Sequence, residues 1–245
     1  MIVEKHIVIE GNHQLKGELE VKGAKNAVLK QMVLPILAEG DYTLSNVPNI
    51  TDVLYMQEVL DVLGIKTELT DNKLHIHSPK DIGIEAPYEL VQKMRASIIV
   101  LGPLLARKGE AKIAFPGGDE LGPRPVQMHL DALEKMGAYF TLDHGVLTGK
   151  SDGLKGVEIN LPYASVGATE NLIIASSFAK GKTILKNCAI EPEIKDLINF
   201  LRKMGCNIKW SGKRTITIIG VNKLQETKYK IMFDRIEAGT YMIAS

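Results

Sequence analysis

Residues 98–115 read Ile98-Ile99-Val100-Leu101-Gly102-Pro103-Leu104-Leu105-Ala106-Arg107-Lys108-Gly109-Glu110-Ala111-Lys112-Ile113-Ala114-Phe115. The first part belongs to a helix expected at Val91–Ala106 that is apolar nearly all round, which is the pattern of a helix buried inside a domain. Gly109 stands where a glycine is expected just past a helix end. Ala111–Phe115 then reads as a short apolar strand.

The same order occurs before and after this stretch. Gly40 and Gly181 close similar apolar helical patterns, at distances of 109−40 = 69 and 181−109 = 72 residues from Gly109. Each is followed by an expected strand, at Tyr42–Asn46 and Thr183–Asn187. The spacing predicts a unit of about 70 residues that is present three times.

Each unit continues with a second amphipathic helix that ends at a glycine, namely Gly64, Gly137 or Gly205. Two strands follow, as in Lys66–Leu69 with Leu74–His77 and Asn207–Trp210 with Thr215–Ile219. Turns are expected between them at Asp71-Asn72 and Gly212-Lys213. The predicted unit is therefore strand, helix, strand, helix, strand, strand.

Three such units are expected to pack around shared helices into one α/β globule, because a single unit cannot cover its own apolar faces. Ile236–Ser245 resembles the start of a further unit, since it is similar to Ala168–Ile174. The chain stops inside this apolar helical pattern. We therefore expect it to be the front part of a longer protein.

The composition is that of an ordinary globular protein. Among 245 residues, 45% are hydrophobic and 24% charged, the formal net charge is +1 and aromatic residues make up 5%. This balance predicts neither a nucleic-acid nor an acidic-membrane partner. Met1–Glu10 lacks a signal peptide's apolar segment and no run of eighteen apolar residues occurs, so a cytoplasmic protein is expected. Cys188 and Cys206, which lack metal-ligand spacing, are expected to be small core residues.

A loop is expected at Phe115–Pro125, where three glycines and three prolines surround Asp119, Glu120 and Arg124. Such a loop changes shape easily and presents its charged side chains to a site. A plain solvated connection is the alternative, because Asp and Gly also make ordinary turns. Strand Ala111–Phe115 before it and a helix after it would anchor both ends.

Polar residues open the first helix of each unit, where free N–H groups and the helix dipole attract anions. They are Lys25-Asn26, Met94-Arg95-Ala96-Ser97 and Ser165-Val166-Gly167-Ala168-Thr169. Symmetrical packing of the units would bring these starts together, and the cations, hydroxyl and unhindered backbone donors suit phosphate groups. Taken singly, each is better explained as a helix cap or a solvated cation, and recurrence at equivalent positions of the repeat is what favours a binding site.

Two weaker candidates lie elsewhere in the chain. His75 and His77 share one side of a strand, but without a third ligand they indicate exposed histidines rather than a metal site. Asp234-Arg235 is either a surface ion pair of small energy or part of a site to which the following helix contributes.

The ordered motifs resemble the UDP-N-acetylglucosamine 1-carboxyvinyltransferase family of enolpyruvyl transferases over the whole chain. The matching segments are Gly23-Ala24-Lys25-Asn26-Ala27, Lys93-Met94-Arg95-Ala96-Ser97, Gly102-Pro103-Leu104-Leu105-Ala106-Arg107, Pro116-Gly117-Gly118, Arg124-Pro125, Ser165-Val166-Gly167-Ala168-Thr169, Glu191-Pro192-Glu193-Ile194 and Asp234-Arg235-Ile236-Glu237-Ala238-Gly239-Thr240. The resemblance implies an inside-out α/β barrel. Residues 25–232 would form the complete loop-bearing globule of three repeats, and residues 1–24 and 233–245 would be parts of a second globule.

The resemblance also implies the reaction. An enolpyruvyl group passes from phosphoenolpyruvate to the 3′-hydroxyl of UDP-N-acetylglucosamine, phosphate is released, and neither a metal nor an organic cofactor is needed. This is the first committed step of peptidoglycan synthesis. The missing C-terminal part of the same protein would complete the active site.

By the same resemblance, most substrate contacts come from helix starts. Lys25 and Arg124 would hold the phosphate and carboxylate of phosphoenolpyruvate, and Lys25 would also be a catalytic residue. Asn26 would bind the sugar and Arg95 the substrate pair. Ser165-Val166-Gly167, with Tyr163 and Ala164 before it, would bind the diphosphate. The segment beside the uracil would be Arg124-Pro125-Val126-Gln127-Met128, in which Gln127 replaces the usual aspartate.

Asp119 is the main departure from the family pattern, because most members carry a cysteine in this loop position. That cysteine acts as the acid of the addition step and is alkylated by fosfomycin. A carboxyl group does the same work if burial raises its pKa, although Arg124 and Lys25 would lower it. The resemblance therefore implies that Asp119 is the general acid, with Glu120 as the rival, and that the full-length enzyme resists fosfomycin.

Two other functions compete with this reading. The first is a non-catalytic sugar-nucleotide-binding fragment, because the family's active site lies between two globules. The second is an enolpyruvyl transferase for shikimate 3-phosphate, which shares the fold. Lys25-Asn26 and Ser165-Val166-Gly167-Ala168-Thr169 favour the sugar nucleotide over shikimate 3-phosphate.

Overall fold

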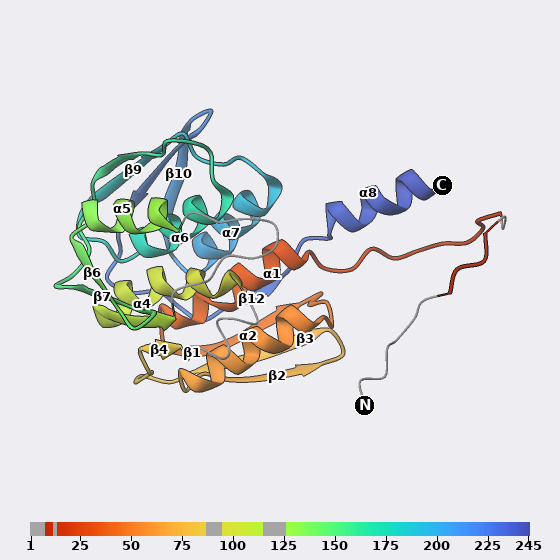
Figure 1. The fold of residues 1–245 in the computed structure, drawn as a ribbon, viewed down its shortest axis with the longest axis horizontal. Helices are drawn as coiled ribbons and strands as arrows, with labels where there is room; N and C mark the ends of the chain where they lie inside the picture. Colours follow the sequence, from red (N-terminus) through yellow and green to blue (C-terminus); the bar gives the residue numbers. More distant parts are fainter. Residues whose placement is uncertain (1–7, 12–13, 87–94, 115–125) are drawn as a thin grey trace.

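The computed structural model of the chain describes residues 8–11, 14–86, 95–114 and 126–245, with the side chains of 95–97 excepted. These residues form a mixed α/β body in which helices lie between and against β-sheets (Figure 1). The segment before α1 and the helix α8 extend to one side of that body. Both chain ends of the described part therefore lie on the same side.

Within the described residues there are three sheets of four strands each. The strands are given in their order across each sheet. The first sheet contains β12 (Lys228–Lys230), β1 (Gly40–Ser45), β3 (Lys73–Ser78) and β2 (Lys66–Thr70). The second contains β4 (Glu85–Ala86), β5 (Glu110–Ala114), β7 (Val146–Ser151) and β6 (Ala138–Asp143), and the third contains β8 (Glu158–Asn160), β9 (Lys182–Lys186), β11 (Thr215–Ile219) and β10 (Asn207–Gly212).

All three sheets have the same pairing pattern. In each sheet, a short edge strand pairs in parallel with its neighbour, and the other two pairs of neighbouring strands are antiparallel. In the first sheet the parallel edge strand is β12, which follows the third sheet in the chain and pairs Thr43 with Lys228. The end of the globule thus completes the sheet formed at its beginning.

Helices before α8 carry the apolar faces that cover these sheets, and α8 has no buried residue. The described helices are α1 (Lys25–Met32), the 3₁₀ turn η1 (Leu34–Ile36), α2 (Thr51–Val62), the 3₁₀ helix η2 (Arg95–Val100), α4 (Leu101–Lys108), α5 (Gln127–Lys135), α6 (Val166–Ser176), α7 (Pro192–Lys203) and α8 (Arg235–Ala244). Every residue of α6 from Ala168 to Ser176 is buried. Since α6 packs against α4, α5 and α7, it is the central helix of the body.

The prediction of one continuous helix over Val91–Ala106 is wrong. The structure has a 3₁₀ helix at Arg95–Val100 and an α-helix at Leu101–Lys108, while residues 91–94 lie outside the described part. Pro103 explains the break, because it has no N–H to donate to the carbonyl of Ile99 and is tolerated only in the first turn of a helix. The predicted end is confirmed by Gly109, which is the left-handed C-cap with φ of 70°.

The hairpins agree with the sequence except in one turn. Asp71 and Asn72 both have positive φ values, 50° and 58°, as a tight turn between β2 and β3 requires. The turn expected at Gly212-Lys213 lies one residue later, because the pairing of β10 shifts between Trp210 and Gly212 and Gly212 pairs with Thr215. A β-bulge of this kind adds one residue to a strand and moves the turn.

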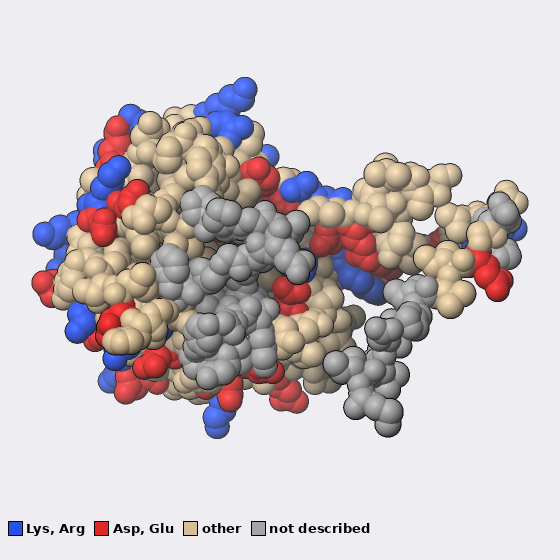
Figure 2. Space-filling model, in the orientation of Figure 1, with Lys and Arg blue, Asp and Glu red and all other residues tan. Residues whose placement is uncertain are grey.

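Cys188 and Cys206 are both buried and free of a disulfide, as expected for small core residues. Burial raises the pKa of Cys188 to about 12 and that of Cys206 to about 11, so both stay as thiols. Lys, Arg, Asp and Glu are interspersed over the described surface of the visible face (Figure 2). Among the described helices, none is long and apolar enough to cross a membrane.

The close approach of α4 to α6 gives a first prediction. A Cβ at Gly102 would overlap Asn171 Oδ1 and lie 2.8 Å from its backbone oxygen. Gly102→Ala is therefore expected to lower the free energy of unfolding by about 3 kcal/mol, as overpacking does. Urea unfolding measures this difference. Gly239→Ala in α8 is the control, because a Cβ there meets nothing within 4 Å; an equal loss in both variants contradicts the prediction.

Candidate functional site

The start of α1 presents Lys25 and Asn26. Ala24 precedes the helix without a side-chain cap, and the backbone N–H of Lys25 donates to Asp234 Oδ2 at 3.1 Å. The Lys25 side chain is half exposed, and its Nζ lies 3.9 Å from Asp52 Oδ2. A cation beside the free N–H groups of a helix start is a suitable place for an anion.

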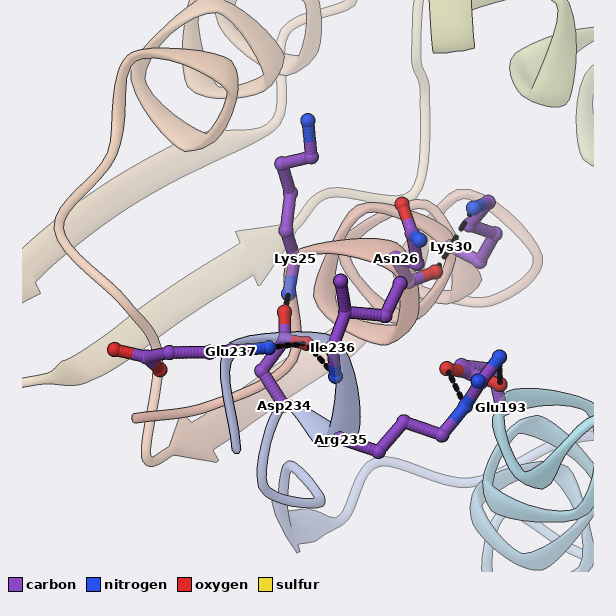
Figure 3. Close-up of polar contacts among 8 residues, drawn as sticks. All are labelled: Lys25, Asn26, Lys30, Glu193, Asp234, Arg235, Ile236 and Glu237. Atoms are coloured by element: carbon purple, nitrogen blue, oxygen red, sulfur yellow. Dashed lines mark hydrogen bonds and ion pairs between the residues drawn. The ribbon is translucent and has the colours of Figure 1, made fainter. Parts of the chain in front are cut away.

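Asp234 joins this helix start to that of α8 (Figure 3). Its Oδ1 accepts from the backbone N–H groups of Ile236 at 2.8 Å and Glu237 at 3.2 Å, which makes it the N-cap of α8. Its Oδ2 accepts from Lys25 N. One carboxylate therefore satisfies donors of two helices and neutralises part of both positive dipole ends.

Arg235 fixes α8 to α7. Its Nε donates to Glu193 Oε1 at 2.9 Å and its Nη2 to Glu193 Oε2 at 3.3 Å, so the contact is bidentate (Figure 3). Glu193 is 4% exposed. The alternative of a weak surface pair for Asp234-Arg235 is thus wrong for Arg235, because a buried bidentate partner holds it.

The start of α6 carries Ser165, Val166 and Gly167, which are all half-buried. Ser165 is the N-cap and its hydroxyl accepts from the backbone N–H of Ala168 at 3.3 Å. Tyr163 is exposed and Ala164 half-buried just before it. The cap leaves N–H groups of Val166 and Gly167 for a ligand at the helix start.

The start of α5 lies beside the start of α6. Val126 is its half-buried N-cap, Gln127 is exposed and donates to Asp131 Oδ1 at 2.7 Å, and Met128 is buried. His129 then brings the two helices together, because its ring lies 3.6 Å from the position of a Cβ on Gly167.

His129 is held in one tautomer by Asn171. Gly102 N–H donates to Asn171 Oδ1 at 3.0 Å, so the Asn171 amide nitrogen must be the donor to His129 Nδ1 at 3.1 Å and to Ile98 O. The proton of the neutral imidazole is therefore on Nε2, on the side of Gly167. Burial lowers the pKa of His129 to about 4, which keeps the ring neutral.

Glu170 and Lys30 connect the starts of α6 and α1. Lys30 Nζ lies 3.5 Å from Glu170 Oε2 and donates to the carbonyl of Asn26 at 2.8 Å. Burial raises the pKa of Glu170 to about 7, against the attraction of Lys30. Contacts of described residues thus link α6 to α1 and to α5. Of the three helix starts expected from the repeat, this joins those at Lys25-Asn26 and Ser165-Val166-Gly167, while the one at Met94-Arg95-Ala96-Ser97 lies outside the described side chains.

Asp119, Glu120, Arg124 and Pro125 lie outside the described residues, as does the side chain of Arg95. Among the described residues, no group of three or more His, Cys, Asp or Glu has an arrangement that could hold a metal ion. His75 and His77 are exposed on β3, as the sequence indicates.

Sequence reasoning missed His129, Asn171, Lys30 and Glu170. The available signal was the helix at 166–176, which is apolar apart from a few residues and therefore buried all round. A Glu and an Asn inside such a helix need partners on neighbouring elements.

The fold is that of enolpyruvyl transferases of known structure. The enolpyruvyl transferase NikO from Streptomyces tendae superposes with a TM-score of 0.86 at 20% identity, over 96% of this chain and 56% of that protein. EPSP synthase from Acinetobacter baumannii superposes with a TM-score of 0.75 at 22% identity, over 95% of this chain and 53% of that protein.

The sequence model of the EPSP synthase (3-phosphoshikimate 1-carboxyvinyltransferase) family matches residues 9–245, and the chain belongs to that family. It is also 49% identical over 242 residues to a protein of Pelagibacter ubique (strain HTCC1062) named UDP-N-acetylglucosamine 1-carboxyvinyltransferase, covering 98% of this chain and 58% of the relative. A protein of the same name from Lawsonia intracellularis (strain PHE/MN1-00) is 49% identical, with 98% and 57% covered. The chain thus spans 57–58% of the length of these relatives.

The two buried titratable groups predict opposite pH dependences of stability. The pKa of Glu170 is raised from 4.5 to about 7, so its contribution is full below pH 4.5 and is lost as the pH rises to about 7. The pKa of His129 is lowered from 6.5 to about 4, so its contribution is full above pH 6.5 and is lost as the pH falls to about 4. The two slopes oppose each other between these limits.

Each single substitution should therefore expose the slope of the other group. The quantity compared is the unfolding free energy of the variant minus that of the wild type. For Glu170→Gln this difference is expected to rise by about 3 kcal/mol from pH 4.5 to pH 7. For His129→Gln it is expected to fall by about 3 kcal/mol from pH 4 to pH 6.5. Urea unfolding at each pH measures both differences. Parallel curves for the two variants would show that the assignment of the slopes is wrong.

Proposed function

We propose that the protein to which this chain belongs transfers the enolpyruvyl group of phosphoenolpyruvate to the 3′-hydroxyl of UDP-N-acetylglucosamine and releases phosphate. The observation that carries this proposal is 49% identity over 98% of the chain to proteins named for that reaction. It implies a place in the cytoplasm and in peptidoglycan synthesis. Because the chain spans 57–58% of those relatives, the activity is assigned to the whole protein.

In this proposal residues 25–232 form one globule, an inside-out α/β barrel of three units of about 70 residues. The common pairing pattern of the three sheets and the completion of the first sheet by β12 support it. Residues 1–24 and 233–245 belong to a second globule. The bridge between Gly23 and Phe233 and the lack of buried residues in α8 support this boundary.

The reaction has two steps whose charges match the helix starts. In the addition, the 3′-hydroxyl attacks C2 of phosphoenolpyruvate, its proton is released to a base, and C3 receives a proton from an acid. In the elimination, C3 loses a proton and the C–O bond to phosphate breaks. Fixed cations and helix N-termini stabilise the phosphate and the carboxylate throughout.

The residue roles follow the family pattern. Lys25, Arg95 and Arg124 bind the anionic groups of the substrates, Asn26 binds the sugar, and Ser165-Val166-Gly167, after Tyr163 and Ala164, binds the diphosphate. The uracil lies beside the segment Pro125, Val126, Gln127 and Met128. Asp119 protonates C3. Neutral His129 between the starts of α5 and α6 favours this arrangement, because its Nε2–H faces Gly167 without adding a titrating charge.

A non-catalytic sugar-nucleotide-binding fragment is the second candidate for the 245-residue chain itself. The coverage of the relatives favours it, since groups on the remaining 42% of their length have no counterpart in this chain. Transfer to shikimate 3-phosphate, the reaction for which the family is named, finds less support because the relatives named above carry the sugar-nucleotide name.

Calorimetric titration with UDP-N-acetylglucosamine, with and without phosphoenolpyruvate, tests the proposal on this chain, and phosphate release is assayed in the same samples. Binding with turnover supports the transferase, and binding without turnover supports the fragment. Binding of shikimate 3-phosphate instead would overturn the assignment of the acceptor. Reading the gene past the codon of Ser245 shows whether a longer protein must be tested.

The Asp119 assignment predicts the response to fosfomycin. In a catalytically active form, the wild type is expected to resist the epoxide because Asp119 offers no thiol, and Asp119→Cys should be inactivated in a time-dependent way. Asp119→Ala should lower kcat by about 10²- to 10⁴-fold, as loss of a general acid does. Glu120→Ala is the matched control; a larger loss in that variant would transfer the acid role to Glu120.

A further inference from the structure

The side chain of Glu170 is the most costly buried group of α6. It lies one turn after the Ser165 cap and is 1% exposed. Neither of its carboxylate oxygens accepts a hydrogen bond within the described residues. A buried carboxylate without hydrogen bonds is strongly unfavourable, so its ion pair with Lys30 has to compensate for the burial.

The ammonium group of Lys30 contacts two helices. Its Nζ donates to the carbonyl of Asn26 at 2.8 Å within α1, and it lies 3.5 Å from Glu170 Oε2 on α6. The side chain is 16% exposed, so the interaction is weakly screened by water. Figure 3 shows the bond from Lys30 to Asn26 in the first turn of α1, which also holds Lys25. Together with the ion pair to Glu170, this bond couples the first turn of α1 to α6.

The other charges that face Glu170 come from the α7 side. Glu193 and Glu191 both disfavour the ionised form of Glu170. Glu193 is neutralised by Arg235, and Glu191 has one buried oxygen without a hydrogen bond. Lys30 is thus the positive group that lowers the pKa of Glu170, against burial and the two acidic neighbours that raise it.

We propose that Lys30 and Glu170 are positioning residues, which hold the starts of α1 and α6 at a fixed separation so that both bind one UDP-sugar. This inference rests on the proposed function. Asn26 and Ser165-Val166-Gly167 are each within about one turn of the pair. Since a helix transmits a displacement along its axis, loss of the pair moves the sugar-binding group relative to the diphosphate-binding groups.

A pair that only stabilised the fold would behave differently. Its loss would lower the free energy of unfolding but leave the affinity of the folded molecules unchanged. Gln31 supplies a matched control, because it is the next residue of α1, is fully buried and bonds Asp196 on α7 rather than α6. Gln31→Met therefore disturbs α1 packing without removing the link to α6.

Hydrogen exchange tests the positioning without any ligand. Glu170→Gln and Lys30→Met are each expected to accelerate exchange of first-turn amides on both helices, among them Val28 on α1 and Thr169 on α6. The double variant should resemble either single variant, because the pair acts as a unit. Gln31→Met should leave Thr169 unchanged. Unchanged exchange at Thr169 in Glu170→Gln overturns the proposal.

Calorimetry with UDP-N-acetylglucosamine tests the consequence for binding. Glu170→Gln and Lys30→Met should each weaken binding about tenfold at pH 8, a typical size for coupled residues, and the double variant no further. Gln31→Met should bind like the wild type. Equal weakening in Gln31→Met would show a general effect of α1 packing and overturn the proposal.

The pH dependence of binding affinity is a further test, because a purely structural role of the pair would leave it unchanged. Between pH 8 and 6 the wild type should lose affinity as Glu170 takes up a proton, whereas Glu170→Gln should lose less. All titratable groups other than Glu170 are common to both proteins, so their effects cancel in the comparison. If the wild type binds no UDP-N-acetylglucosamine at either pH, the proposed function of this chain fails, and hydrogen exchange alone decides whether the pair positions the helices.

Discussion

Burial of α6 on all sides from Ala168 to Ser176 is the constraint on which the helical core depends. A polar side chain on a helix without an exposed face must find its partner on a neighbouring element. Asn171 reaches α4 and α5 by way of Gly102 and His129, Thr169 accepts from Ala189 N–H before α7, and Glu170 reaches α1 by way of Lys30. The polar residues of one helix thus fix the positions of four others.

These partners also decide the charge states near the helix starts. His129 has no acidic partner among the described residues and is neutral because burial dominates its pKa. Glu170 has a cation at 3.5 Å, yet burial and two acidic neighbours still outweigh the attraction. Desolvation therefore decides both cases, in opposite directions for an acid and a base: it keeps the His129 ring neutral near pH 7 and disfavours the ionised form of Glu170.

Local patterns were sufficient to predict most strands, the second helices and the glycines with positive φ, because period, caps and turns are local properties. They were insufficient at Val91–Ala106, where one proline changed the hydrogen-bond pattern, and at Gly212-Lys213, where a bulge shifted the turn. The contacts of Lys30, His129 and Glu170 depend on tertiary packing, which no local pattern reports. The roles of Asp119 and Arg124 came from family resemblance and stay predictions.

The two connections at the edge of the globule are bound to each other before either leaves it. Ala24 N–H donates to the carbonyl of Met232, Asp234 N–H donates to the carbonyl of Lys22, and Asp234 caps α8 while it accepts from Lys25 N–H. Because the same carboxylate serves both helix starts, a rotation of α8 must either carry the start of α1 with it or break that bond. The position of Lys25 is therefore coupled, through the Asp234 side chain alone, to any element that packs on α8.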